Sequence, residues 1–279
     1  AHAELFGGGS PELKLVNPIS SELSDMRPSL IPNLIAAAGR NVARGFGDVA
    51  LFELGQAYAG CQPEDETLRA AGVRRGAFEP RHWAAAQRPV DVFDAKADAL
   101  AALEAAGAPV ANLQAVKGGP AWFHPGRSGT LQLGPKTMLA WFGEIHPRIL
   151  DRMDVKGPLV AFEMVLNAIP EARAKSATRP ALIASDLMAV KRDFAFLMDV
   201  AVEAERVVKA ARSADRALIE EVSVFDVFAG GALGEGKKSI AIEVTLQPRQ
   251  RTLTEAEIEA VSHKIIAQVT RATGATLRG

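Results

Sequence analysis

The sequence has few of the features that mark secreted, membrane-spanning or charge-driven nucleic-acid-binding proteins. Its 279 residues include a single cysteine, Cys61, so no internal disulfide can form, which fits a cytoplasmic protein. Its apolar runs are too short to span a bilayer, and no signal peptide is recognisable. Lys and Arg total 32 and Asp and Glu total 33, so the basic excess typical of sequence-blind nucleic-acid binders is absent. Any RNA contact must therefore be local and assisted by a partner.

Metal-binding and nucleotide-binding motifs are also poorly represented. The histidines are isolated, and none has a second ligand at metal spacing, so no metal site is predicted. The glycine-rich segment 230–239 resembles part of a phosphate-binding loop, which joins a strand to a helix and needs a Ser or Thr after its lysine. Here Lys238 follows Lys237, and a strand-like run comes next. We therefore expect a β-hairpin connection and not a nucleotide site.

The chain divides near residues 169–186, a segment with a proline near each end, several alanines and scattered charges. We interpret it as a linker between two domains, 1–175 and 186–279. In the second domain, the patterns predict strand, helix, strand, strand, helix and strand, which is the order of a ferredoxin-like βαββαβ fold. The predicted elements are 187–199, 203–214, 218–229, 239–247, a helix beginning at Thr254 with a capping box to Glu257, and 275–278.

The first domain is predicted to be α+β. A helix is expected over residues 29–44, and an alanine-rich helix is expected to end at Gly107. We expect these helices to pack on one side of an antiparallel sheet. The predicted strands are 13–18, 49–58, 130–134, 138–145 and 159–166.

Several stretches together resemble one family. In the first domain these are NPISSELSDMRPSLIPNLIAAAGRN, LFELG, HPGRSG and GEIHP. In the second they are KRDFAF, FDVF, EGKKSIAIEVTLQ, RTLTEAEI and the terminal LRG. In this order and spacing they are similar to the C-terminal part of the bacterial phenylalanyl-tRNA synthetase β subunit. That part comprises a class II synthetase-like module, an antiparallel sheet with helices, and a ferredoxin-fold anticodon-binding domain.

The resemblance implies an α2β2 assembly that charges phenylalanine tRNA, with ATP and magnesium used on the α subunit. It implies no catalytic residues and no bound cofactor in this chain. A class II core clamps the ATP α-phosphate with an arginine, usually in the pattern aromatic-Arg-x-Glu. After LFELGQ this chain continues Ala57, Tyr58, Ala59, with alanine at the arginine position.

The resemblance also implies tRNA contacts on the second domain. Alternation predicts that Phe194, Phe196, Phe225 and Val227 lie in the core, so that the open face of the sheet keeps one stacking ring, Phe228. Carboxylates on that face can accept hydrogen bonds from base amino groups, and lysines or arginines at strand ends can contact phosphates. The candidate tRNA contacts are Arg192, Asp193, Asp226, Phe228, Lys237, Lys238 and Arg251.

Three residues of the first domain, Arg27, Asn41 and Arg127, are candidates for the interface with the α subunit. For Arg127 a purely structural role stays open, and Glu53 is expected to form a structural ion pair. Two alternatives remain for the whole chain. One is a free-standing RNA-binding or regulatory module. The other is an enzyme with a small-molecule pocket, which would need converging polar groups.

Overall fold

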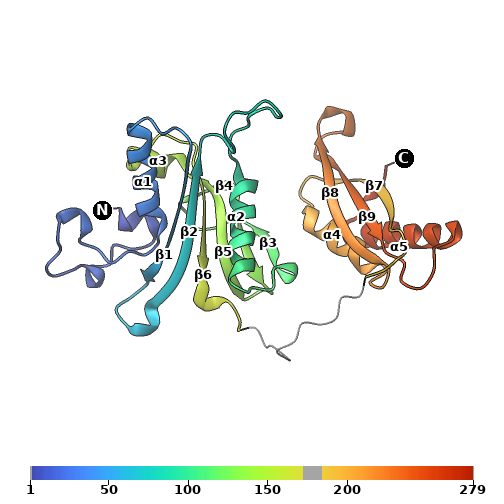
Figure 1. The fold of residues 1–279 in the computed structure, drawn as a ribbon, viewed down its shortest axis with the longest axis horizontal. Helices are drawn as coiled ribbons and strands as arrows, with labels where there is room; N and C mark the ends of the chain where they lie inside the picture. Colours follow the sequence, from blue (N-terminus) through green and yellow to red (C-terminus); the bar gives the residue numbers. More distant parts are fainter. Residues whose placement is uncertain (1, 172–183, 279) are drawn as a thin grey trace. The chain divides into compact units, whose positions relative to one another are not determined.

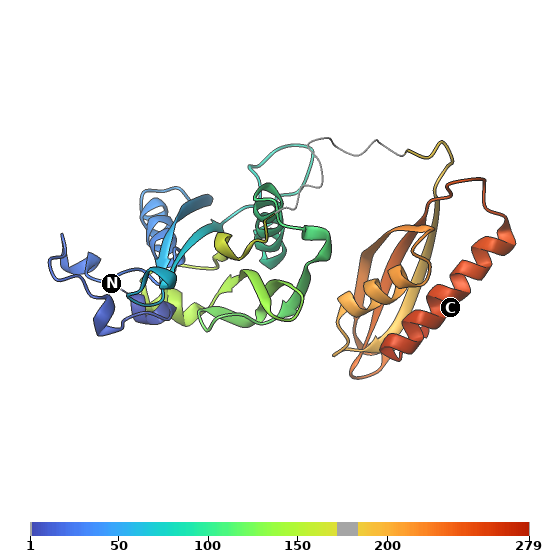
Figure 2. The same cartoon turned by 90° about the horizontal axis from the view of Figure 1, so that it is seen from below.

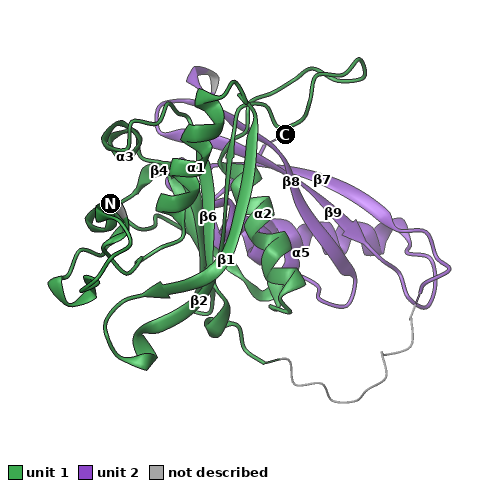
Figure 3. Cartoon of the chain, turned by 60° about the vertical axis from the view of Figure 1, so that its left-hand side comes forward, with its two compact units in different colours: residues 1–175 green, residues 176–279 purple. Residues whose placement is uncertain are grey.

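The computed structural model describes residues 2–171 and 184–278, and the chain forms two compact units, 1–175 and 176–279 (Figures 1 and 3). Both units are α+β, as predicted. The expected linker at 169–186 lies largely outside the described residues. Within the described ranges, no helix combines the length and the apolar character needed to cross a membrane.

Unit 1 contains a six-stranded antiparallel sheet in the order β1-β2-β6-β5-β4-β3. Its central strand β6 is buried along its whole length. The strands are β1 (Val49–Tyr58), β2 (Glu66–Arg75), β3 (Gln114–Lys117), β4 (Phe123–Leu133), β5 (Thr137–Ile145) and β6 (Val160–Val165).

Helices cover both faces of this sheet, not one face as expected (Figure 1). Helix α1 (Ile31–Ala43) and the short α3 (Pro147–Arg152) contribute to one apolar core, and α2 (Val92–Ala105) contributes to another. Neighbouring residues of β6 divide between the two cores: Ala161 belongs to the first and Phe162 to the second. Such double burial favours apolar side chains at successive positions of the central strand, and Glu163 is the exception among the residues of β6.

The strand predicted over 13–18 is wrong. Residues Pro11–Leu13 form a 3-10 turn, and only an isolated bridge joins Lys14 to Asp25. Strand β2 was not predicted because its sequence, ETLRAAGVRR, is rich in helix-forming Ala and Arg. The helix at 29–44 and the strands at 49–58, 130–134, 138–145 and 159–166 are confirmed with shifted ends.

Unit 2 is a four-stranded antiparallel sheet in the order β10-β7-β9-β8, with two helices packed on one face (Figure 2). Its chain order confirms the βαββαβ prediction. The elements are β7 (Val190–Asp199), α4 (Ala204–Ser213), β8 (Ile219–Ala229), β9 (Lys237–Leu246), α5 (Glu255–Thr273) and β10 (Thr276–Leu277). The glycine-rich segment joins the paired strands β8 and β9, as the hairpin prediction requires, with Gly234 and Gly236 at positive φ.

The apolar core of unit 2 follows the predicted alternation on β7 and β9. Phe194 and Phe196 are buried. On β9 the buried positions are Ile240, Ile242, Val244 and Leu246. Helix α5 begins at the predicted capping box between Thr254 and Glu257, and Gly274 ends it with a φ of 70°. The intervening positions on β9 therefore face away from the helices.

Candidate functional site

The sheet face of unit 2 that lies away from its helices carries two adjacent rows of side chains near the β8–β9 hairpin. In one row, Ala195 and Asp226 lie opposite Ala241 on the two sides of β9. In the next row, Phe228 lies opposite Ser239. Because the two alanines are small, the exposed carboxylate of Asp226 has open space beside it on the sheet surface. Asp226 and Phe228, both predicted as contacts, therefore lie on one face, two residues apart.

The prediction that Phe225 and Val227 are core residues is wrong. A β-bulge between Val224 and Asp226 inserts Phe225 as an extra residue, which takes it out of the alternation. Val227 keeps its helix-side register opposite Ile240 but is not covered there. Phe225 is 58% exposed, Val227 56% and Phe228 45%. The hairpin end therefore exposes two aromatic rings instead of one. A bulge leaves no signal in the hydrophobic pattern, which is why the sequence did not reveal Phe225.

The two lysines at the start of β9 lie on opposite faces of the sheet. Lys237 is opposite Asp199 and shares the outward face with Ser239, whereas Lys238 is opposite Met198 on the helix side. Neither lysine forms an ion pair with any residue that the structure describes. Lys237 thus adds an available positive charge two residues along β9 from the row of Phe228.

The remaining candidates do not join this group. Arg192 lies opposite Val244, which places it on the helix side of β7. Asp193 is on the outward face, but its cross-strand neighbour is Glu243, which already binds Lys191 at 2.7 Å. A second carboxylate beside Glu243 makes this part of the face acidic.

Arg251 lies beyond the other end of β9. The ten residues of β9 span about 30 Å, so Arg251 and Lys237 are at opposite ends of the sheet. Arg251 donates to both carboxylate oxygens of Glu257, at 3.0 and 2.5 Å. This pair and the capping hydrogen bonds from Thr254 lower the pKa of Glu257 to about 2. Arg251 is thus engaged at the start of α5.

In unit 1 the most deeply buried charge is Glu163, in the middle of β6, with 0% exposure. Its carboxylate accepts hydrogen bonds from the Ser29 hydroxyl at 2.9 Å, the Leu30 amide at 2.8 Å and the Arg69 guanidinium at 3.4 Å. Burial raises the pKa of Glu163, and the charge of Arg69 opposes that shift in part. A glutamate in an otherwise apolar strand is the sequence signal that could have identified this residue.

Arg27 and Glu53 form the ion pair expected for Glu53. The Arg27 Nε also donates to the Gln56 carbonyl at 2.7 Å, and its guanidinium lies directly against Gly55, where any Cβ would collide with it. The Arg27 side chain is therefore held against β1 inside this chain.

The other two interface candidates also have partners within the chain. Asn41 donates from Nδ2 to the Ala37 carbonyl of α1 at 2.9 Å. Arg127, on β4, pairs with Glu144 on β5 at 2.8 Å and is half-exposed. Both contacts leave part of each side chain accessible.

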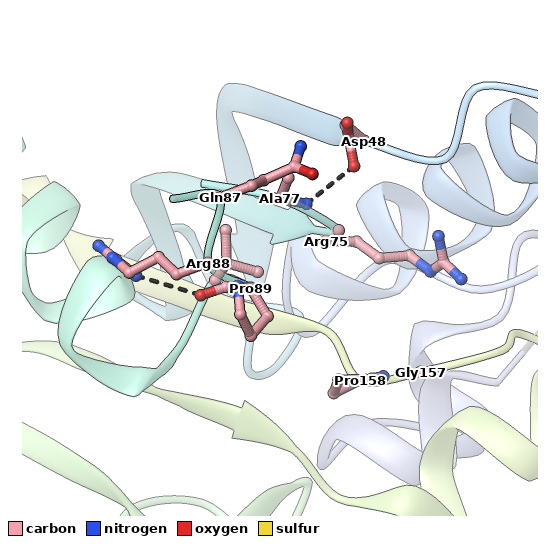
Figure 4. A pocket seen from close by; sticks show the side chains of 10 residues that line it. Asp48, Arg75, Ala77, Gln87, Arg88, Pro89, Gly157 and Pro158 are labelled. Carbon is pink, nitrogen blue, oxygen red and sulfur yellow. Dashed lines mark hydrogen bonds between the residues drawn. The ribbon is translucent and has the colours of Figure 1, made fainter. Parts of the chain in front are cut away.

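A pocket of about 460 Å³ in unit 1 has Asp48, Arg75 and Arg88 among its lining residues (Figure 4). The two guanidinium groups point away from each other in Figure 4. Arg88 is bound to Asp94, and Arg75 donates to backbone carbonyl groups. Polar groups do not converge there, so the small-molecule-enzyme alternative gains no support. Nor do three His, Cys, Asp or Glu side chains cluster as metal ligands anywhere in the described part of the chain.

Comparisons with known proteins match both units. Residues 2–166 match the family model of the phenylalanyl tRNA synthetase beta chain CLM domain, and residues 185–278 match the ferredoxin-fold anticodon binding domain. The fold and these matches define a two-domain α+β protein that carries an anticodon-binding domain. The chain belongs to the phenylalanyl-tRNA synthetase β-chain family.

Curated relatives agree over the whole chain. It is 59% identical over 284 residues to the phenylalanine–tRNA ligase beta subunit of Brucella suis. It is 56% identical to that of Mesorhizobium japonicum and 55% identical to that of Rhodospirillum rubrum. The matches cover all of this chain but 35% of each relative, so the chain spans about a third of the length of these proteins.

Proposed function

We propose that this chain is the part of a phenylalanine–tRNA ligase β subunit that contacts the tRNA anticodon region through unit 2 and docks the α subunit through unit 1. In this proposal the enzyme is an α2β2 assembly, and the chain contributes no catalytic residue to ATP-dependent charging. The observation that carries the tRNA assignment is the pair of rows that holds Asp226 and Phe228 on one open sheet face, in a unit that matches an anticodon-binding family.

The chemistry of that face suits an unstacked RNA base. The ring of Phe228 offers a stacking surface, a contact that contributes about 1–3 kcal/mol per base. The Asp226 carboxylate accepts a hydrogen bond from a base amino or imino group, and the space beside Ala195 and Ala241 admits the base edge. Lys237 then supplies a phosphate contact at the end of the same face.

Unit 1 does not fit ATP and magnesium. A phosphate clamp needs free cationic groups on the sheet. Of the arginines on or against β1 and β2, Arg27 is paired with Glu53, Arg69 with the buried Glu163 and Arg74 with Asp98. Arg75 donates to the Lys156 and Gly47 carbonyls. Ala59, which follows the aromatic Tyr58 at the position where the clamp arginine is expected, has no cationic group to offer a phosphate. We therefore assign ATP, magnesium and the adenylate chemistry to the α subunit.

The tRNA assignment is tested by titrating the chain with a phenylalanine-tRNA anticodon stem-loop and with an unrelated stem-loop, at several salt concentrations. Phe228→Ala should weaken binding of the cognate loop about 5- to 150-fold, the equivalent of 1–3 kcal/mol. Asp226→Asn should reduce the preference for the cognate loop, because it removes the negative charge and replaces one of the two acceptor oxygens with an amide donor.

Val227→Ala is the matched control, because Val227 is as exposed as its neighbour but lies opposite Ile240, on the other face of the sheet. Equal loss with Val227→Ala and Phe228→Ala would contradict the assignment to the outward face. Equal binding of both stem-loops would favour a general RNA-binding module over an anticodon reader.

A further inference from the structure

A projecting loop of unit 1 holds the most exposed tryptophan of the chain. Residues 76–90 project from unit 1 between the end of β2 and the start of α2, and we call them the Trp83 finger (Figure 1). Trp83 is 99% exposed, whereas Trp122 and Trp141 are partly buried. Because tryptophan has a large apolar surface and is enriched at protein interfaces, an uncovered ring at a loop tip is a candidate contact with another molecule.

The base of the Trp83 finger is fixed. The Phe78 amide donates to the Arg88 carbonyl and the Val90 amide to the Gly76 carbonyl, both at 3.0 Å. The Arg88 guanidinium stacks over the Phe78 ring at 4.1 Å and also binds Asp94 of α2 through two hydrogen bonds, at 2.8 and 2.6 Å. A tip on such a base loses little conformational freedom when it binds.

The tip is apolar and weakly charged. Three alanines follow Trp83, and Pro80 precedes it. The imidazole of His82 contacts Glu79 at 3.2 Å, and Arg88 is bound to Asp94, which leaves Arg81 as the one cation of the finger without an ion pair in the described structure. RNA-stacking surfaces combine aromatic rings with a basic groove, and this tip has no such groove. A tryptophan flanked by one arginine is instead the composition of a protein–protein anchor.

We propose that the Trp83 finger anchors the α subunit of the ligase. Trp83 inserts into an apolar pocket that offers an acceptor for the indole N–H, and Arg81 meets an acidic group at its rim. This inference rests on the proposed docking of the α subunit by unit 1, and adds the element and the side chain that make the contact. Docking through an aromatic anchor accounts for a fully exposed Trp83 on a loop whose base is fixed to its own unit.

The test uses the full chain labelled with 5-hydroxytryptophan, so that its fluorescence can be excited apart from tryptophan in the added α subunit. In the free chain, iodide should quench a fluorescence component that Trp83→Phe removes. Adding the α subunit should protect that component from iodide. Trp83→Ala should weaken α-subunit binding by about 30-fold or more, as expected for an aromatic hot spot, while Trp83→Phe restores part of the affinity.

Met188→Ala is the matched control, because Met188 is an apolar side chain of unit 2 with 88% exposure. It should leave the affinity unchanged, and neither variant should change the thermal midpoint. Wild-type binding that Trp83→Ala does not weaken would overturn the anchor and leave the docking proposal standing. No binding by the wild-type chain would overturn both. If Trp83→Ala keeps α-subunit binding but loses stem-loop binding, the Trp83 finger binds RNA instead. If it keeps α-subunit binding but loses self-association, the Trp83 finger contacts a second copy of the chain.

Discussion

The two sheets of this chain differ in where they place their charges. Unit 1 buries ionisable groups: Glu163 lies at the centre of its sheet, and Asp94 lies beneath Arg88 at the start of α2. The core of unit 2 consists entirely of apolar residues, and its charged side chains lie on the helices, at strand ends, in loops and on the outward sheet face.

The polar groups of unit 1 are hydrogen-bonded within the chain, whereas polar groups on the sheet of unit 2 are free to bind a ligand. In unit 1, the carboxylate of Glu163 ties the segment before α1 to β2 and β6, so its hydrogen-bonding capacity is used within the chain. In unit 2, Asp226 and Lys237 have no ion-pair partner among the described residues. A buried network fixes a structure, whereas unpaired polar groups on an open face can meet a ligand.

The largest expected effect comes from breaking the buried pair. Arg69→Met leaves the Glu163 carboxylate without its cation and should lower the unfolding free energy of unit 1 by about 3–5 kcal/mol. Trp83, Trp122 and Trp141 all lie in unit 1, so tryptophan fluorescence during denaturation follows that unit alone. Lys191→Met, which breaks the exposed pair with Glu243 in unit 2, is the control and should leave that transition unchanged. An unchanged transition for Arg69→Met would mean that Glu163 is neutral or finds another partner.

The pH dependence of unit 1 tests the state of Glu163 directly. Burial raises the pKa of Glu163 above its usual value of 4.5, so the folded state holds this proton at pH values where the unfolded state has released it. The unfolding free energy should therefore be highest below pH 4.5 and fall as pH rises through the folded pKa, by at most about 1.4 kcal/mol per pH unit for this group. Glu163→Gln should remove that part of the pH dependence. A wild-type profile identical to that of the variant would contradict the raised pKa.

The capping box of α5 allows stability and its pH dependence to be tested in unit 2. Thr254→Ala removes the hydroxyl that accepts from the Glu257 amide and should cost about 1 kcal/mol. Because the folded pKa of Glu257 is depressed to about 2, its stabilising contribution is present above pH 4.5 and is lost as pH falls toward 2, the reverse of Glu163. The unfolding transition of unit 2, followed by circular dichroism, measures the cost of Thr254→Ala. The same transition recorded at pH values between 2 and 5 measures the contribution of Glu257. Ser262→Ala, inside the same helix, should cost less, since its hydroxyl bonds only the Ile258 carbonyl.

Much of unit 2 could be predicted because its elements carry regular signals. The alternation on β9 and the capping box at Thr254 each depend on residues close together in the sequence. Asp226 and Phe228 were found for the same reason, because strand alternation fixes which face they share. The exposure of Phe225 could not be found, because a bulge depends on the pairing partner and not on the pattern of β8 itself.

Unit 1 is harder to predict from its sequence, because its key contacts join residues far apart in the chain. Ser29 and Glu163 are separated by 134 residues, and nothing local in either segment specifies the other. Strand β2 resembles a helix in composition and becomes a strand because β1 and β6 pair with both its edges. The Trp83 finger could not be predicted, because the exposure of a single tryptophan has no signature in the sequence.

The weakest effect on stability is expected for Arg127, whose substitution tests whether unit 1 also keeps a surface charge for a partner. The pair of Arg127 with Glu144 is half-exposed, so Arg127→Ala should change the unfolding free energy of unit 1 by about 0–1 kcal/mol. If Arg127 contacts the α subunit as proposed, the same variant should weaken α-subunit binding measured by isothermal titration calorimetry, and the loss should shrink as salt screens the contact. Glu144→Gln separates the two roles, because it removes the intrachain partner and keeps the cation. Equal loss of affinity for both variants would make Arg127 a residue positioned by Glu144, and no loss for Arg127→Ala would remove it from the interface.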